Sequence, residues 1–168
     1  MLLIELTNEK PNLYLLVGLP GTGKSTYIKD VLSKTLKNYV VVSSDDVLER
    51  IATEKNKTYD DIFLDNIDAA TQESNSIFEK ALKNNLSIVV DKTNLSIKSR
   101  KKWLQRCGDR YNKIAVIFEV DDHTICNRLE QRSKQSGKTI RPQIFIDMKK
   151  RYQPPSLGEG FDQIIKVD

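Results

Sequence analysis

Eight residues early in the chain have the types and the spacing of a phosphate-binding loop. Residues 18–25 read Gly-Leu-Pro-Gly-Thr-Gly-Lys-Ser and match the pattern G-x-x-x-x-G-K-[ST]. The glycines let several backbone N–H groups point at one phosphate, and the N-terminal end of the following helix adds positive charge. We therefore expect a nucleoside triphosphate here, bound by Gly18, Pro20, Gly21, Thr22, Gly23, Lys24, Ser25 and Thr26.

Two residues of this P-loop have side chains that are suited to binding phosphate and a metal ion. Lys24 is expected to reach the β- and γ-phosphates, and the Ser25 hydroxyl is expected to hold Mg²⁺. A glycine-rich turn that carries them by chance is the alternative. The loop lies between the apolar run 13–17, typical of a buried strand, and a segment with helical spacing, which disfavours that alternative.

Carboxylates follow the next two predicted strands. Phosphoryl transfer needs a group that accepts the proton of the nucleophile, and Asp45 or Asp46 is the natural candidate. Because Asp46 and Glu49 have the spacing of a capping box, we expect Asp46 to cap the next helix and Asp45 to face the cleft. Asp91 is a candidate to bind Mg²⁺ through water. Its alternative role is to order its loop together with Asn94.

Basic residues later in the chain are suited to charge on a transferring phosphoryl group. Arg128 and Arg132 stand four residues apart, so they share one face of a predicted helix. Lys138 and Arg141 fall in a segment, about 135–141, that we expect to act as a small lid. Cations on a closing lid would stabilise the developing charge. The alternative is that all four are solvated surface residues.

Composition narrows the class of protein. The 168 residues have a net charge of +4, and residues 98–113 hold seven basic residues and one acidic residue. This charge fits an anionic ligand such as a nucleotide or a nucleic acid, or else an ordinary solvated helix face. No apolar run approaches the ~20 residues that span a bilayer, and the start lacks the basic region of a signal peptide. With two cysteines and one histidine, a reduced cytoplasmic setting is expected and a zinc site is not.

Predicted strands alternate with predicted helices along the chain. The strands cover residues 13–17, 39–43, 86–90, 114–118 and 161–167, and the helices cover about 26–36, 47–53, 61–83, 97–107, 123–134 and 142–152. This order predicts an α/β fold, one P-loop domain over residues 1–168 with a parallel sheet and helices on both faces. We also expect Ser96 to cap a helix, Pro142 to start one, and a short strand before Pro11. The site residues should meet at the carboxyl ends of the strands.

With these residues in view, the chain resembles the kinase module of the 5′-hydroxyl polynucleotide kinases, especially the bacteriophage type. The resemblance covers residues 13–167 and rests on residues 18–26, on Ser-Ser-Asp-Asp at 43–46, on Asp-Lys-Thr-Asn-Leu at 91–95, and on the arginine-bearing helix with its lid. The stretch 152–161 is similar to the tail of the kinase part of animal end-repair enzymes.

The resemblance implies an adenylate-kinase-like P-loop fold, ATP as phosphate donor, Mg²⁺ as cofactor and the 5′-OH end of RNA or DNA as acceptor. It implies that Asp45 is the general base and that Arg132 and a lid cation contact the phosphates. Thr93 and Asn94 would belong to a loop near the acceptor, beside Asp91. The implied catalytic residues are Lys24, Asp45 and Arg132. The implied setting is the cytoplasm, which for a phage-encoded enzyme is that of the host.

The chain departs from the phage pattern at three places. Ser44 and Leu48 stand where the pattern has arginines, and the lid arginine falls near Ser136, so Lys138 or Arg141 has to replace it. These departures leave open a P-loop kinase of the same architecture that acts on a small molecule or a charged tRNA. A nucleotide-dependent binding module without catalysis is a further alternative, which the acidic and basic residues above disfavour. The choice of RNA or DNA and the oligomeric state stay open.

Overall fold

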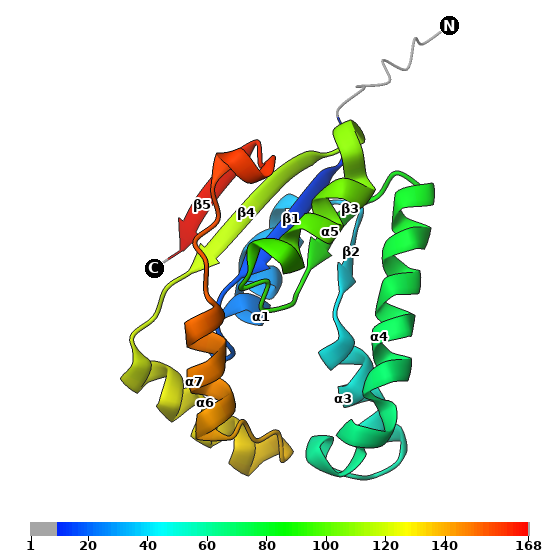
Figure 1. Cartoon of the computed structure of the whole chain (residues 1–168). Helices are drawn as coiled ribbons and strands as arrows, with labels where there is room; N and C mark the ends of the chain where they lie inside the picture. Colours follow the sequence, from blue (N-terminus) through cyan, green and yellow to red (C-terminus); the bar gives the residue numbers. More distant parts are fainter. Residues whose placement is uncertain (1–9, 168) are drawn as a thin grey trace, which may run out of the picture.

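A parallel sheet of five strands forms the centre of the molecule (Figure 1). The structure is a computed structural model and describes residues 10–167. The strand order is β2-β3-β1-β4-β5, with bounds β1 Asn12–Val17, β2 Tyr39–Val42, β3 Ser87–Val90, β4 Asn112–Phe118 and β5 Gln163–Val167. The predicted α/β fold with a parallel sheet is confirmed. The strand expected before Pro11 lies outside the described residues.

Helices follow each of the first four strands. They are α1 Lys24–Tyr27, η1 Ile28–Leu32, α2 Ser33–Thr35, α3 Ser44–Glu54, α4 Tyr59–Lys83, α5 Ile97–Cys107, η2 Gly108–Arg110, α6 Asp122–Ser136, α7 Pro142–Arg151 and η3 Leu157–Glu159. Helices α3, α6 and α7 gather beyond the carboxyl ends of the strands (Figure 1). Within residues 10–167, no helix has both the length and the apolar character that crossing a membrane requires.

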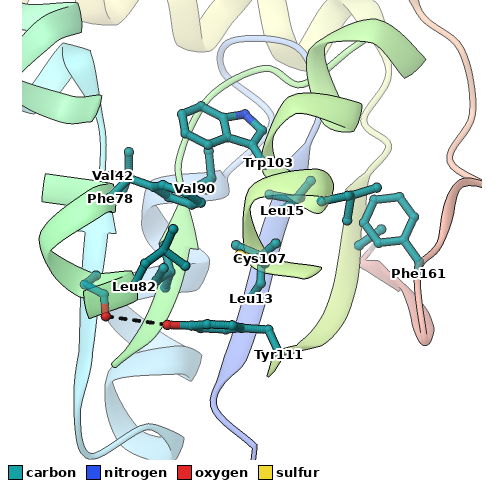
Figure 2. Close-up of a cluster of buried hydrophobic side chains, with 14 residues drawn as sticks. Leu13, Leu15, Val42, Phe78, Leu82, Val90, Trp103, Cys107, Tyr111 and Phe161 are labelled. Carbon is teal, nitrogen blue, oxygen red and sulfur yellow. Dashed lines mark hydrogen bonds between the residues drawn. The ribbon is translucent and has the colours of Figure 1, made fainter. Parts of the chain in front are cut away.

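The core lies on both faces of the sheet because successive strand side chains point to opposite faces. On one face, Leu13 and Leu15 of β1 pack with Phe78 of α4 and Trp103 of α5 (Figure 2). The Phe78 and Trp103 rings lie 4.8 Å apart between centroids, at 58°. On the other face, residues of β1, β3 and β4 pack against the helix that follows the P-loop. The site therefore rests on a sheet covered on both faces.

Two predicted helix starts agree with the structure. The Ser96 hydroxyl accepts a hydrogen bond from the Ser99 N–H at 3.1 Å and caps α5, and Pro142 occupies the first turn of α7.

The prediction that Asp46 caps α3 is wrong. The cap is Ser43, whose Oγ accepts a hydrogen bond from the Asp46 N–H at 3.1 Å. Strand β2 ends at Val42, so Ser43 is still extended while Ser44 already begins the helix. Asp46 therefore falls in the first turn of α3, where it lines the cleft.

The lid segment lies against the N-terminal end of α4. Residues 135 and 136 continue α6, so the connecting segment is 137–141. The Thr139 N–H donates to both carboxylate oxygens of Asp60 at 3.2 and 3.1 Å, and the Asp60 N–H donates to the Gly137 carbonyl at 3.2 Å. Gly137 has a φ of +64°, and a Cβ there would lie 2.7 Å from the Thr58 Cβ. Glycine is what allows this close contact.

Candidate active site

A cleft of about 1090 Å³ opens at the carboxyl ends of the strands. Its lining includes the P-loop and polar residues that follow other strands or lie on α6: Asp45, Asp46, Glu49, Asp91, Thr93, Glu119, Arg128 and Arg132. Parallel strands bring their carboxyl ends to one edge of a sheet, so residues far apart in the sequence meet here.

The P-loop joins β1 to α1 and binds its own lysine. The Lys24 Nζ donates to the carbonyl oxygens of Gly18 at 2.9 Å and of Leu19 at 2.8 Å. Gly21 and Gly23 have φ values of +83° and +98°, the left-handed region that glycine adopts at little cost. Lys24 is buried, and this burial lowers the pKa of its ammonium to about 8. The loop therefore holds a cation that neutral oxygens only partly compensate.

Ser25 and Asp91 offer a pair of oxygen ligands beside the loop. The Ser25 hydroxyl donates to the Asp91 Oδ2 at 3.2 Å. Burial raises the pKa of Asp91, and the nearby Lys24 ammonium opposes that effect. A hydroxyl and a carboxylate are ligands that Mg²⁺ prefers, either directly or through water. The pair fits this ion.

Both carboxylate oxygens of Asp45 already have donors. The Tyr59 hydroxyl donates to Oδ1 at 2.8 Å, and the Lys138 Nζ donates to Oδ2 at 2.6 Å. Lys138 also lies 3.4 Å from the Glu49 Oε1 and 4.4 Å from the centroid of the Tyr59 ring. Burial raises the pKa of Asp45, but the Lys138 ammonium and the Tyr59 hydroxyl outweigh it and bring the pKa below its ordinary value. The lid lysine thus holds the candidate base rather than a phosphate site.

Asp46 also faces the cleft, which the sequence had led us to expect of Asp45 alone. Burial and the nearby Asp91 carboxylate raise the pKa of Asp46. The two neighbours differ in their partners: Asp45 is bound by a cation and a phenol, whereas Asp46 lies among other acids. Only Asp45 is therefore held in one orientation by side-chain donors from other elements.

The two α6 arginines line the cleft, as their spacing predicted. Arg128 donates to the Gly21 carbonyl at 3.1 Å, so it lies over the P-loop. Arg132 donates to the Glu49 Oε1 at 3.1 Å and bridges α6 to α3. Arg141 is the exposed residue that precedes α7 and is not among the residues that line the cleft.

The loop after β3 divides its residues between the cleft and the core. Thr93 lines the cleft, and its carbonyl accepts a hydrogen bond from the Gly18 N–H at 3.1 Å. Asn94 is only 3% exposed, and its side-chain amide donates to the Leu16 carbonyl at 2.8 Å, to the Val90 carbonyl at the end of β3 and to the Lys92 carbonyl of its own loop. It therefore ties the loop to the sheet and does not reach the cleft.

A buried ion pair anchors the same loop from behind. Arg100 of α5 is fully buried and donates to the Asn94 carbonyl at 2.9 Å. Its guanidinium also makes two 2.8 Å bonds to the carboxylate of Glu159 in η3. The two parallel bonds and the backbone contact satisfy a charge that burial would otherwise disfavour.

Residues 13–155 match the family model for the AAA domain. The chain belongs to this AAA domain family. Within residues 10–167 this AAA domain has the five-stranded parallel sheet of P-loop kinases, and membership of the family supports phosphotransferase activity.

The relatives of this AAA domain include enzymes that act on nucleic acids. It is 28% identical over 170 residues to the bifunctional polynucleotide phosphatase/kinase of Schizosaccharomyces pombe, and the match covers 95% of this chain and 34% of that protein. It is 24% identical over 157 residues to the L-seryl-tRNA(Sec) kinase of Methanococcus maripaludis, covering 89% of this chain and 56% of that protein. The chain thus spans about a third of the length of the first of these curated relatives and just over half of the second.

Solved structures show the same fold. A chain of the Pnkp1/Rnl/Hen1 RNA repair complex superposes with a TM-score of 0.66 at 23% identity, over 88% of this chain and 45% of that one. The family match and the similarity to the Schizosaccharomyces pombe protein together confirm the predicted resemblance to polynucleotide kinase domains, and the solved structure agrees with it in fold.

The AAA domain also has a residue beside the site that sequence reasoning missed. Tyr59 contacts Asp45 from the start of α4, and no local pattern marks it. Leu48, which stands where the resemblance implies an arginine, is fully buried between α3 and α4 and cannot reach a substrate.

Proposed function

We propose that this AAA domain is an ATP-dependent kinase that transfers the γ-phosphate to the 5′-OH end of RNA or DNA. One observation carries the proposal: the P-loop, the half-exposed carboxylate of Asp45 and the two α6 arginines share one cleft. A P-loop alone fits nucleotide binding, whereas a nearby base and cations fit transfer. The similarity to a polynucleotide phosphatase/kinase supports this class of acceptor.

The donor half of the reaction uses the P-loop and its neighbours. Backbone N–H groups hold the ATP phosphates, and Lys24 exchanges its bonds to loop carbonyls for bonds to phosphate oxygens. Arg128 and Arg132 add positive charge where the transferring group becomes more negative. Ser25 and Asp91 would hold Mg²⁺, which when bound neutralises charge on the phosphates.

The acceptor half uses Asp45. Its carboxylate takes the proton of the 5′-OH as the bond between that oxygen and phosphorus forms, and ADP leaves on the opposite side. One oxygen of Asp45 has to turn to the acceptor, so Lys138 leaves Oδ2 when the substrates bind. Its departure removes the strongest effect that lowers the pKa of Asp45, which makes the carboxylate a better base. The freed Lys138 ammonium is then available to the phosphates.

A transfer assay with labelled ATP tests the proposal. The acceptors are short 5′-OH oligonucleotides, free nucleosides, small alcohols and an aminoacylated tRNA, and Lys24→Ala is the inactive control. Transfer to oligonucleotides is the expected result. Transfer only to small alcohols or to the charged tRNA would instead identify a P-loop kinase that acts on a small molecule or a charged tRNA. The similarity to L-seryl-tRNA(Sec) kinase favours this alternative. Nucleotide binding without transfer to any acceptor would leave a binding module.

A further inference from the structure

Glu49 holds two cations with a single carboxylate oxygen. Its Oε1 accepts a hydrogen bond from Arg132 at 3.1 Å and lies 3.4 Å from the Lys138 Nζ. Glu49 belongs to the lining of the P-loop cleft. Because Ser43 caps α3, the capping box that the spacing of Glu49 from Asp46 suggested does not form. Since both cations use the same oxygen, a change in one contact alters the other.

The contact between Arg132 and Glu49 is easily exchanged. The two side chains are 36% and 49% exposed, and an ion pair so open to water contributes little to stability. Arg128, one turn earlier on α6, already donates to the Gly21 carbonyl of the P-loop at 3.1 Å. Arg132 is thus one helical turn from a contact with the P-loop. A bound triphosphate offers it a more highly charged partner than Glu49.

Lys138, by contrast, needs a carboxylate at all times. Its side chain is only 7% exposed, so an unpaired ammonium at this place would be strongly disfavoured. Among the described residues, the carboxylates within 4.0 Å of its Nζ are those of Asp45, at 2.6 Å, and Glu49, at 3.4 Å. Glu49 follows Asp45 by four residues in α3, on the same face of the helix. A short shift of the ammonium therefore exchanges one carboxylate for the other.

We propose that Glu49 couples the ATP site to the proposed base. This inference rests on the proposed function and adds a positioning residue to it. The γ-phosphate of ATP draws Arg132 away from Glu49, which leaves the Glu49 Oε1 to Lys138. Lys138 then moves from Asp45 to Glu49 and uncovers the Asp45 Oδ2. The acceptor hydroxyl thus reaches its base after the donor is in place.

Glu49→Gln separates this role from a structural one. The amide keeps the size of the side chain but attracts cations weakly, so Arg132 is free for the nucleotide while Lys138 stays on Asp45. Binding of β,γ-imido-ATP, a non-hydrolysable analogue, should tighten about 3-fold in the presence of Mg²⁺. The kcat for transfer should nevertheless fall about 10-fold, because the base stays covered. A residue that only stabilised the fold would weaken both.

Glu54→Gln is the matched control. Glu54 lies on the same helix and forms an exposed ion pair with Arg50 at 3.0 Å. It is not among the residues that line the P-loop cleft. Its substitution removes the same charge from α3, so the control should bind the analogue and turn over like the parent.

Acceptor binding measures the coupling without catalysis. Calorimetry gives the affinity for a 5′-OH trinucleotide without nucleotide, with ADP and with β,γ-imido-ATP. In the parent the analogue should raise this affinity at least about 10-fold, and ADP, which has no γ-phosphate, should raise it much less. In Glu49→Gln the effect of the analogue should shrink to within about 2-fold. Lys138→Met should bind the trinucleotide equally with and without the analogue, because its Asp45 is always uncovered.

The double variant Glu49→Gln/Lys138→Met tests whether Glu49 acts through Lys138. In the Lys138→Met background, Glu49→Gln should no longer lower kcat. An equal loss of kcat in both backgrounds overturns the proposal. A Glu49→Gln protein that keeps the effect of the analogue on trinucleotide affinity also overturns it. If that protein in addition melts at a lower temperature, Glu49 only ties α3 to α6 and to the lid.

Failure of the proposed function gives a different result. If the analogue strengthens trinucleotide binding through Glu49 but no phosphate is transferred, the proposed function fails and the coupling stands. If the trinucleotide does not bind under any condition, the proposed acceptor fails, and the affinity for the analogue decides about Glu49. Tighter binding of the analogue by Glu49→Gln than by Glu54→Gln then supports the coupling, and equal or weaker binding overturns it.

Discussion

Lys138 and Asp45 form an ion pair across 93 residues of sequence, with 2.6 Å between Nζ and Oδ2. The pair connects the start of α3 to the segment between α6 and α7. Its lysine is 7% exposed and its aspartate 52%, so the carboxylate stays open to the cleft on one side while the cation is enclosed. The resting position of the lid is therefore linked to the charge state of the proposed base.

This link predicts a pH dependence of stability. Because the pKa of Asp45 is lower in the folded protein, Asp45 stabilises the fold above the ordinary carboxyl pKa, and this stabilisation is lost as the pH falls through the folded value. Lys138→Ala should raise that pKa, reduce stability at neutral pH and make the loss on acidification shallower. Urea unfolding as a function of pH measures this. Arg141→Ala is the control, and an equal effect of both variants would contradict the prediction.

Lys24 predicts a second rise of stability with pH, in the alkaline range. Its folded pKa of about 8 is below the ordinary 10.5, so the free energy of unfolding should rise as the pH increases between these values. Lys24→Met should abolish phosphoryl transfer and flatten this rise without unfolding the protein. Denaturant titrations at neutral and alkaline pH, paired with the transfer assay, test both parts. A folded Lys24→Met protein with near-normal turnover would contradict the assignment of residues 18–25 as the phosphate-binding loop.

Arg132 should matter more to turnover than to stability. It lies in the cleft, and the ion pair that it forms with Glu49 is partly exposed, so Arg132→Ala should cost little stability. If its guanidinium meets charge in the transition state, turnover should fall ~10²-fold. Lys134→Ala, on the same helix and paired with Glu130 at the surface, is the control. Turnover of Arg132→Ala equal to that control would exclude a catalytic role.

Asparagine substitutions at Asp45 and at Asp46 should affect phosphoryl transfer and stability differently. Asp45→Asn should nearly abolish transfer and leave ATP affinity unchanged, because the amide cannot take the proton of the acceptor. Asp46→Asn should keep or raise thermal stability, since burial and Asp91 already raise the pKa of the Asp46 carboxyl. The ~1 kcal/mol cost of a lost cap should instead appear in Ser43→Ala. An inactive Asp46→Asn with an active Asp45→Asn would reverse the two assignments.

Local patterns predicted the parts of the fold that local physics determines. The apolar runs became strands β1 to β5, and the glycine-rich loop fell between β1 and α1, because burial and backbone freedom act over a few residues. The Asp46 error is a shift of three residues: β2 ends at Val42 and α3 begins at Ser44 instead of at about residue 47, so the cap is Ser43. Helix boundaries respond to such small shifts.

Long-range partners were not predictable from a single sequence. Nothing near Tyr59 or Lys138 in the sequence indicates that both reach Asp45, since that contact depends on how α4 and the lid pack. Asn94 shows the converse. The family resemblance implied a place near the acceptor, but its left-handed backbone and buried amide order the loop itself, the alternative that the residues alone had offered.

The Arg100–Glu159 pair has a consequence for the order in which a newly made chain becomes competent. Domains fold as units while synthesis proceeds from the N-terminus. The P-loop and its strand are made early, yet the loop at 91–95 gains its rear anchor only once Glu159 has left the ribosome and can neutralise the Arg100 guanidinium. A nascent chain stalled before that point would have its P-loop but an unanchored loop at 91–95, so these two sides of the cleft become ordered together only after Glu159 has been made.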